Sequence, residues 1–189
     1  MPARRLIPPV VAALALLAGC GGGGGDPKPA QTATTTATTP QAAAPATGDR
    51  IVGTGYELRA AKGWTDVKAQ LQARADVVLA TQSGSIVNVL REKIPSDANR
   101  SVVLAALSRS VLAGADAART SRSTKVVLDG ADGVAFGVRL KTDQGSAAGR
   151  VVIVVHGGYA YAIAGSSSPD EPVPTDTAFA SMLASWRWT

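Results

Sequence analysis

The sequence is poor in the side chains on which most catalytic and metal sites depend. Its 189 residues include one cysteine, Cys20, and one histidine, His156. A single histidine excludes any site that needs two of them, and a single cysteine excludes an intramolecular disulfide. The stability of the fold must therefore come from a hydrophobic core.

Aromatic residues and clusters of charge are also scarce. All eight aromatic residues lie after residue 50, so the first quarter of the chain does not belong to the core. Residues 50–189 carry 16 lysines and arginines against 12 aspartates and glutamates, without a basic run or a basic helical stripe. We therefore expect no nucleic-acid partner.

The amino terminus has the pattern of a bacterial export signal. Residues 1–5 carry positive charge, and the apolar stretch 6–16 is too short to span a bilayer. The stretch ends in Leu17-Ala18-Gly19-Cys20, which resembles the bacterial lipobox. The resemblance implies that residues 1–19 are a signal peptide removed before Cys20. It also implies that diacylglycerol is attached to the cysteine sulfur and that the new amino terminus is acylated, for example with palmitate.

Residues 20–49 are predicted to be a flexible tether. The Gly21–Gly25 run and the Pro/Thr/Ala tract after it contain almost no large apolar residues, so they cannot offset the entropy of ordering. As a coil the tether reaches on the order of 30 Å, and roughly 90 Å when extended. We expect a protein anchored on the extracytoplasmic face of a cell membrane, with lipid on Cys20 as its one covalent group and no other cofactor. The Ala/Gly/Arg-rich usage is typical of a high-GC, actinobacteria-like organism.

Hydrophobic periodicity predicts an α+β fold for residues 50–189. Alternation with a period of two favours strands, and a spacing of three and four favours helices. The resulting order is a strand, a hairpin, a helix, a four-stranded meander and a closing helix. The predicted strands are 56–60, 76–81, 85–91, 122–128, 133–141, 150–156 and 159–164, and the predicted helices are 99–114 and 176–185.

The connections are short, which favours antiparallel neighbours. We therefore expect an antiparallel sheet of about six or seven strands sandwiched between helices, an α/β/α sandwich. The run 151–155 is apolar on both faces and is expected to be a central strand. In the first helix, Ser108 is expected to lie off the apolar stripe. Gly53-Thr54-Gly55 is expected to be a loop before the first strand.

Several short motifs in residues 55–189 resemble the PsbP-like family, which includes the extrinsic PsbP protein of photosystem II, the Ran-binding Mog protein and LpqN-type bacterial lipoproteins. They are Tyr56-Glu57-Leu58, Gly63-Trp64, Asn88-Val89-Leu90-Arg91, Gly157-Gly158-Tyr159-Ala160-Tyr161 and Ser185-Trp186-Arg187-Trp188. The resemblance implies an antiparallel sheet between helical layers and a non-enzymatic accessory or assembly role. Many family members have a proline before Gly-Trp, where this chain has Ala61-Lys62.

No motif predicts a catalytic residue or a metal ligand. His156 directly precedes Gly157-Gly158, so it is expected to flank a hairpin turn opposite Tyr159. The segment Asp129–Gly133 lacks the alternating ligands and final glutamate of a calcium loop. The serines form no Gly-x-Ser-x-Gly elbow.

Four residues are predicted to form a partner surface. Arg139, Lys141 and Arg150 meet on one face if the loop 142–147 closes a regular hairpin. Of Trp186 and Trp188, one is expected to pack inward while the other, Trp188 in our assignment, faces out and offers an apolar contact.

The sequence therefore predicts a non-catalytic lipoprotein whose domain binds an envelope protein, or a lipidic or cell-wall partner. An alternative is a transport accessory that binds a small molecule in a groove between sheet and helix. An envelope hydrolase is a further alternative, and it would need polar side chains gathered around His156 or the turn at Asp129–Asp132.

Overall fold

The computed structural model describes residues 43–71, 73–114, 117–142, 145–168 and 172–189. The predicted signal peptide, Cys20 and residues 21–42 of the predicted tether lie outside the described residues. The end of the predicted tether lies against the domain, because Ala46 is buried and its backbone N–H donates to the Ser181 carbonyl at 2.9 Å. In the described part of the chain, no helix is long and apolar enough to cross a membrane.

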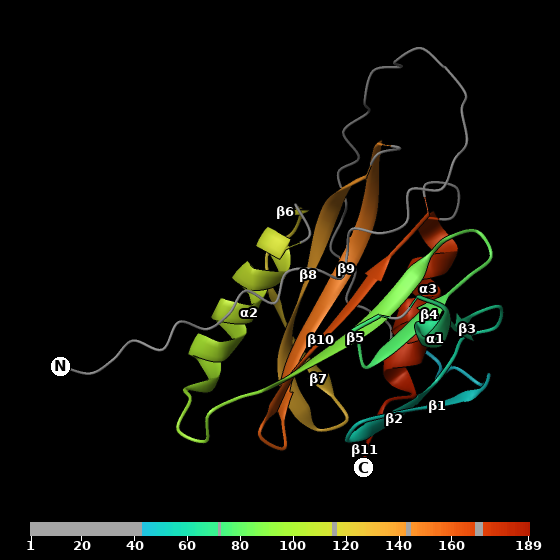
Figure 1. The fold of residues 1–189 in the computed structure, drawn as a ribbon. Coiled ribbons are helices and arrows are strands. Elements are labelled where there is room, and N and C mark those ends of the chain that lie inside the picture. The colour runs from blue at the N-terminus through green and yellow to red at the C-terminus, as the bar shows by residue number, and fades with distance from the viewer. Residues whose placement is uncertain (1–42, 72, 115–116, 143–144, 169–171) are drawn as a thin grey trace.

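Two antiparallel sheets and three helices make up the described fold (Figure 1). The main sheet has eight strands in the order β3-β4-β5-β10-β9-β8-β6, with β7 also paired to β8. They are β3 (Thr65–Asp66), β4 (Val77–Ala80), β5 (Ile86–Lys93), β6 (Ala117–Arg119), β7 (Thr124–Leu128), β8 (Ala131–Thr142), β9 (Gly145–His156) and β10 (Tyr159–Ser166). The second sheet has the order β1-β2-β11, with β1 (Arg50–Gly53), β2 (Tyr56–Arg59) and β11 (Arg187–Trp188). The helices are α1 (Lys68–Leu71), α2 (Arg100–Gly114) and α3 (Pro172–Ala184).

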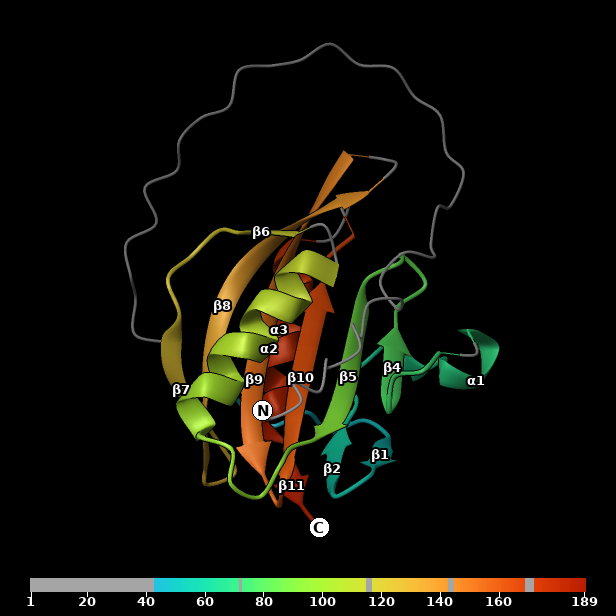
Figure 2. The ribbon, with the colours of Figure 1, turned by 60° about the vertical axis from the view of Figure 1, so that its left-hand side comes forward.

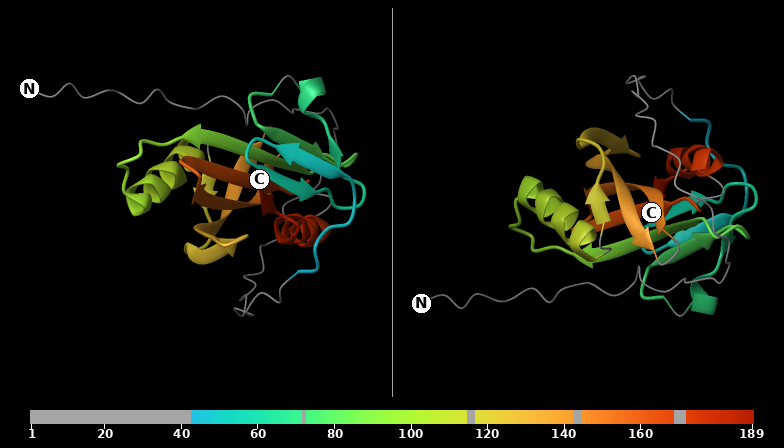
Figure 3. Two further views of the ribbon diagram at one scale, coloured as in Figure 1. Left: turned by 90° about the horizontal axis from the view of Figure 1, so that it is seen from below. Right: turned by 90° about the horizontal axis from the view of Figure 1, so that it is seen from above.

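The two faces of the main sheet are covered differently. The helix α2 lies on one face, and α3 lies on the other together with the three-stranded sheet (Figures 2 and 3). The predicted sheet between helical layers is therefore confirmed in part, because a second sheet shares the cover on one face. The prediction of six or seven strands was too low, since the main sheet has eight and the second sheet has three.

The strand β9 is central, as its apolar run predicted. Residues 151–154 are all buried, with Val151 and Ile153 packed under α2 and Val152 and Val154 in the larger core on the opposite face. Because both faces of the strand are covered, its sequence is a continuous hydrophobic run and does not alternate.

The helix α2 begins and packs largely as its sequence indicates. The side chain of Asn99 accepts a hydrogen bond from the backbone N–H of Ser101 at 3.0 Å, which caps the first turn. Leu104, Leu107 and Val111 pack against the sheet. The placement of Ser108 off the apolar stripe was wrong: the side chain is buried, and its hydroxyl donates to the Leu104 carbonyl at 2.8 Å. This internal bond satisfies the hydroxyl and allows it to face the sheet.

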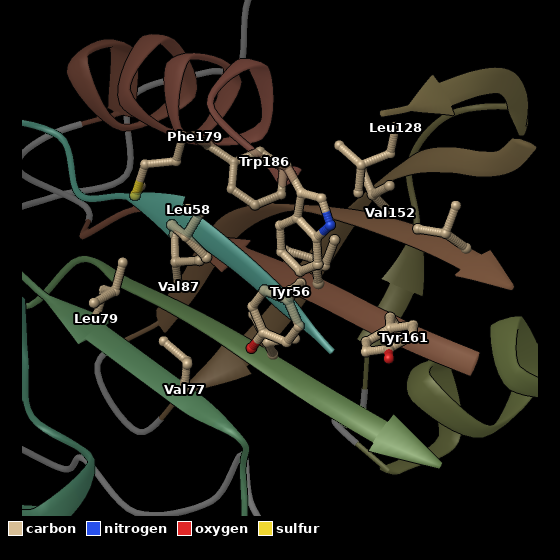
Figure 4. Packing of buried hydrophobic residues seen from close by; sticks show 14 of the residues in the cluster. Tyr56, Leu58, Val77, Leu79, Val87, Leu128, Val152, Tyr161, Phe179 and Trp186 are labelled. Carbon is tan, nitrogen blue, oxygen red and sulfur yellow. The ribbon is translucent and has the colours of Figure 1, made fainter. Parts of the chain in front are cut away.

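Aromatic rings fill the larger core. Tyr56 of β2 stacks on Trp186 with ring centroids 4.0 Å apart, and Tyr161 of β10 meets Tyr56 edge-on at 5.7 Å (Figure 4). Gly165 on β10 makes room for Phe179 of α3, because a Cβ at this position would lie 2.9 Å from the phenylalanine ring. The glycine therefore lets α3 approach the sheet closely.

The segment Gly53–Tyr56 is a hairpin turn and not the predicted loop before the first strand. Gly53 pairs with Tyr56, and Gly55 adopts a φ of 84° in the turn between β1 and β2. An Asp129-Gly130 turn with two positive φ values joins β7 to β8, and Gly157-Gly158 joins β9 to β10 in the same way. Two successive residues with positive φ match the right-handed twist of the strands that they connect.

Candidate functional site

The β8–β9 hairpin brings together the three basic residues of the predicted partner surface. Arg139 pairs with Ala148, Lys141 with Ser146 and Gly137 with Arg150, so the three basic side chains share one face of the ladder. All three are exposed. Figure 1 shows this hairpin extending past the ends of the neighbouring strands at the top of the view. We call Arg139, Lys141 and Arg150 the hairpin basic face.

The face of the β8–β9 hairpin that carries the basic residues is buried near the core and exposed toward the hairpin tip. Ala135 and Val152, on the same face nearer the core, are buried beneath α3 and the second sheet. Neither Arg139 nor Arg150 forms an ion pair with a described residue. The hairpin basic face is thus a cationic surface set on a rigid strand pair.

Trp188 lies at the other end of the sheet. It stacks on His156 with ring centroids 4.2 Å apart. His156 lies six positions after Arg150 on β9, which corresponds to about 20 Å. The structure therefore divides the predicted partner surface in two, and Trp188 does not adjoin the hairpin basic face.

Trp188 is held on several sides and is not fully outward. Its backbone N–H donates to Asp129 Oδ2 at 2.9 Å, and its indole N–H donates to the Leu128 carbonyl at 3.0 Å. Trp186 is buried, as one of the two tryptophans was expected to be, but Trp188 is only half-exposed and packs against the larger core. Both N–H donors are already satisfied, so Trp188 closes this end of the core.

His156 occupies the strand end that the sequence predicted. It pairs with Tyr159 across the Gly157-Gly158 turn, and its ring covers one side of the Trp188 indole. Within the described ranges, no group of three or more His, Cys, Asp and Glu side chains is placed to hold a metal ion. The described surroundings of His156 supply a stacking partner, and no described hydroxyl or carboxylate is hydrogen-bonded to its ring.

Among the described residues, the titratable group with the most perturbed pKa is a tyrosine inside the core. Burial raises the pKa of Tyr56 far above its ordinary value, and the nearby Asp76 carboxylate raises this pKa further. The Asp76 carboxylate accepts hydrogen bonds from the Thr54 backbone N–H at 2.8 Å and from the Thr54 hydroxyl at 2.9 Å. Since the phenol keeps its proton at neutral pH, Tyr56 cannot act there as a base or a phenolate nucleophile.

A groove of about 370 Å³ lies on the outer side of the three-stranded sheet, and the sequence did not predict it. Its lining includes three arginines and one glutamate. The lining residues are Pro45, Ala46, Thr47, Arg50, Glu57, Leu58, Arg59, Ser185 and Arg187. Alternation in β2 indicated that Glu57 and Arg59 share a face, but no sequence signal indicated that β11 would place Arg187 beside them. We call this the arginine groove.

A second cavity lies between α2 and the sheet, where a small-molecule groove was expected as an alternative. Its volume is about 20 Å³. That volume holds about one water molecule and is far below the roughly 300 Å³ of the smallest ligand pockets. Asn88 lines the cavity, and its buried side-chain oxygen has no hydrogen-bond partner among the described residues. A single water on Asn88 fits this cavity better than a metabolite does.

Comparison with known proteins identifies the fold. No protein-family model and no curated protein sequence matches the chain. The solution structure of cyanobacterial PsbP (CyanoP) from Synechocystis sp. PCC 6803 matches with a TM-score of 0.57 at 17% identity, over 75% of this chain and 92% of that chain. A crystal structure from Bacteroides thetaiotaomicron matches with a TM-score of 0.53 at 8% identity, over 75% of this chain and 48% of that chain.

The Ran-binding protein Mog1p of Saccharomyces cerevisiae is a more distant match, with a TM-score of 0.46 at 9% identity, over 75% of this chain and 96% of that chain. The match with cyanobacterial PsbP shows that the fold of the chain is PsbP-like, as the motif resemblance implied. At these identities the likeness concerns the fold alone, and the resemblance to LpqN-type lipoproteins stays a prediction.

Proposed function

We propose that this chain, whose fold is PsbP-like, is a lipid-anchored accessory protein on the extracytoplasmic face of a cell membrane and binds an acidic envelope protein. The domain acts by binding and not by catalysis. The observation that carries the proposal is the hairpin basic face, where three cations share one exposed face of a regular strand pair.

The geometry of the hairpin suits recognition. Its two strands are paired without interruption from Gly133–Val154 to Thr142–Gly145, so the cations sit at fixed spacings on a stiff element. Charges held in this way steer a partner of opposite sign and select its orientation. A tether from Cys20 adds a limit, because the partner must lie within its reach, on the order of 30 Å as a coil.

The experiment is photo-crosslinking in the native cell from two matched exposed positions. One probe replaces Ala148, which lies directly opposite Arg139, and the control probe replaces Ala105 on the solvent side of α2. We expect the Ala148 probe to capture a discrete protein, and the Ala105 probe not to capture it. Arg139→Glu should abolish the capture, because it reverses one charge at the centre of the face.

Trp188→Ala serves as a second comparison in the same cells. It should leave the capture intact if the protein stays folded, since Trp188 lies about 20 Å away along β9. Equal capture from both probes, or capture that survives Arg139→Glu, contradicts the proposal.

A carrier that holds a small molecule between sheet and helix, and an envelope hydrolase, are weaker candidates. The cavity under α2 has room for about one water. The His156 ring is stacked on Trp188, and the neighbouring Asp129 carboxylate accepts a backbone hydrogen bond. Neither arrangement favours ligand transport or general-base chemistry.

A further inference from the structure

Three arginines and a glutamate project from the outer face of the three-stranded sheet. The register places Arg50 opposite Arg59 and Arg187 opposite Glu57. Residues that lie opposite one another, or two apart on one strand, share a face, so these four side chains lie together. The other face carries Tyr56 and Trp186 into the core.

The outer face of the three-stranded sheet carries more positive than negative charge. Glu57 accepts two hydrogen bonds from the Arg50 guanidinium, one of them from Nε at 2.7 Å. Like charges placed directly opposite in a strand pair are destabilising, and Arg50 and Arg59 stand in this relation. A bound anion would relieve the repulsion.

Arg59 and Arg187 each have guanidinium N–H groups that can donate to a ligand. Arg59 Nη1 donates to the Gly48 carbonyl at 3.2 Å, and Arg187 Nη1 donates to the Trp186 carbonyl at 2.5 Å. Arg187 Nη1 also lies 3.9 Å from Asp129 Oδ1, a long ion pair with both groups partly exposed. A guanidinium carries five N–H donors in a planar fork, so each arginine has donors that no described acceptor takes. That fork matches the oxygens of a phosphate group.

The groove has fixed walls as well as charge. Residues 45–47 form one wall, held by a hydrogen bond from the Ala46 backbone N–H to the Ser181 carbonyl at 2.9 Å. Ser185 forms another part, and its hydroxyl accepts a bond from the Arg59 backbone N–H at 2.9 Å. The volume of about 370 Å³ is within the range of small-ligand sites.

The wall at residues 45–47 is also the point at which the chain from Cys20 joins the domain. The arginine groove therefore opens on the side of the domain where its tether attaches. We propose that the arginine groove binds a phosphate-class anion, either the phosphodiester of an anionic lipid headgroup or phosphate in solution. This site is distinct from the hairpin basic face and does not depend on it.

Calorimetry on the full protein, purified from its membrane in a neutral detergent, tests the site. The probes are inorganic phosphate and dihexanoyl phosphatidylglycerol. Dihexanoyl phosphatidylcholine, whose own choline cation offsets the charge of its phosphodiester, is the zwitterionic control. We expect binding of phosphatidylglycerol, of phosphate or of both, and weaker binding at high salt. Arg59→Gln and Arg187→Gln should each weaken it about fivefold, which corresponds to about 1 kcal/mol.

Two further variants separate the groove from general charge and from misfolding. Arg109→Gln removes the same charge from the exposed side of α2 and should leave binding unchanged. Glu57→Gln releases Arg50 from its carboxylate partner and should strengthen binding about fivefold, a gain that loss of structure does not produce. Circular dichroism confirms that each variant is folded.

The two probes distinguish the two sources of the anion. Phosphatidylglycerol binding without phosphate binding identifies a lipid headgroup site, and binding of inorganic phosphate identifies a site for the free anion. The proposal is overturned if neither probe binds, if Arg109→Gln weakens binding as much as Arg59→Gln, or if Glu57→Gln has no effect.

Discussion

At the scale of single residues, the burial of Tyr56 affects both the packing of the core and the ionisation of its phenol. Its phenol oxygen is buried and has no hydrogen-bond partner among the described residues. The ring stacks on Trp186, so the side chain contributes apolar contact while its polar atom is left unsatisfied. A phenylalanine at this position would keep the stacking and remove the unsatisfied atom.

The raised pKa of Tyr56 predicts a loss of stability at alkaline pH. The folded protein holds the phenol proton, and the unfolded chain releases it above a pKa of about 10. The free energy of unfolding should thus be flat below about pH 10 and fall above it by about 1.4 kcal/mol per pH unit for this residue. Denaturant unfolding of the wild type and Tyr56→Phe between about pH 8 and pH 11 measures the slope.

Above about pH 10, the free energy of unfolding of Tyr56→Phe should fall less steeply with pH than that of the wild type, by the slope of one proton. At neutral pH the two free energies should agree within about 1 kcal/mol. The pKa of Tyr161 is also raised, mainly by burial, so some alkaline loss should remain in the variant. Identical slopes for the two proteins would show that Tyr56 ionises normally in the fold.

Gly165 is a second residue whose role is local and testable. Gly165→Ala should destabilise the protein by about 1–3 kcal/mol, because the new methyl group would overlap the Phe179 ring in a packed core. Phe179→Leu, which is also destabilising, should relieve part of that overlap, so the double variant should cost less than the sum of the two single changes. Simple additivity in denaturant unfolding would contradict a direct contact between the two positions.

At the scale of elements, the C-terminal strand β11 acts as a clasp. It pairs with β2, directly follows the buried Trp186, and holds the β7–β8 turn through the two hydrogen bonds of Trp188. The stack between Trp188 and His156 adds the end of β9 to the same cluster. Four segments distant in sequence meet at this clasp.

The clasp predicts that Trp188 contributes to stability. Trp188→Ala should lower the free energy of unfolding by about 2 kcal/mol, less than for a fully buried tryptophan because the ring is half-exposed. His156→Ala should cost less, and a double-mutant cycle should give a coupling of about 0.5–1.5 kcal/mol for the stacked pair. An unchanged stability for Trp188→Ala would indicate an outward-facing contact residue, as the sequence alone suggested.

The longer elements were predictable and the shortest were not. The strands β5, β8, β9 and β10 each have eight or more residues, enough for alternation or a continuous apolar run to be recognised. The strands β3, β6 and β11 have two or three residues, too few to carry a period, and each is defined by the partner that it pairs with.

Because only local patterns can be recognised in the sequence, the hairpin basic face was predicted and the arginine groove was not. The hairpin basic face lies within one local hairpin, so a regular turn sufficed to align Arg139 and Arg150. The arginine groove joins Arg59 to Arg187 through the pairing of β2 with the short β11, a contact between opposite ends of the domain. No local pattern encodes such a pairing.

At the scale of the whole molecule, the fold separates its surfaces. The hairpin basic face stands at one end of the main sheet, the clasp closes the other end, and the arginine groove lies on the outer sheet beside the wall formed by residues 45–47. A lipid on Cys20 would fix the groove side toward the tether and leave the hairpin to reach a partner. Such an anchor would constrain what both surfaces can meet.

Intact-mass spectrometry of the protein from the cell membrane fraction tests the anchor most directly. We predict a chain that begins at Cys20 and carries the added mass of a diacylglyceryl group and an amino-terminal acyl chain. Cys20→Ser should lose this mass and leave the membrane fraction. A wild-type chain that retains residues 1–19, or that begins at Cys20 without lipid, would contradict the account.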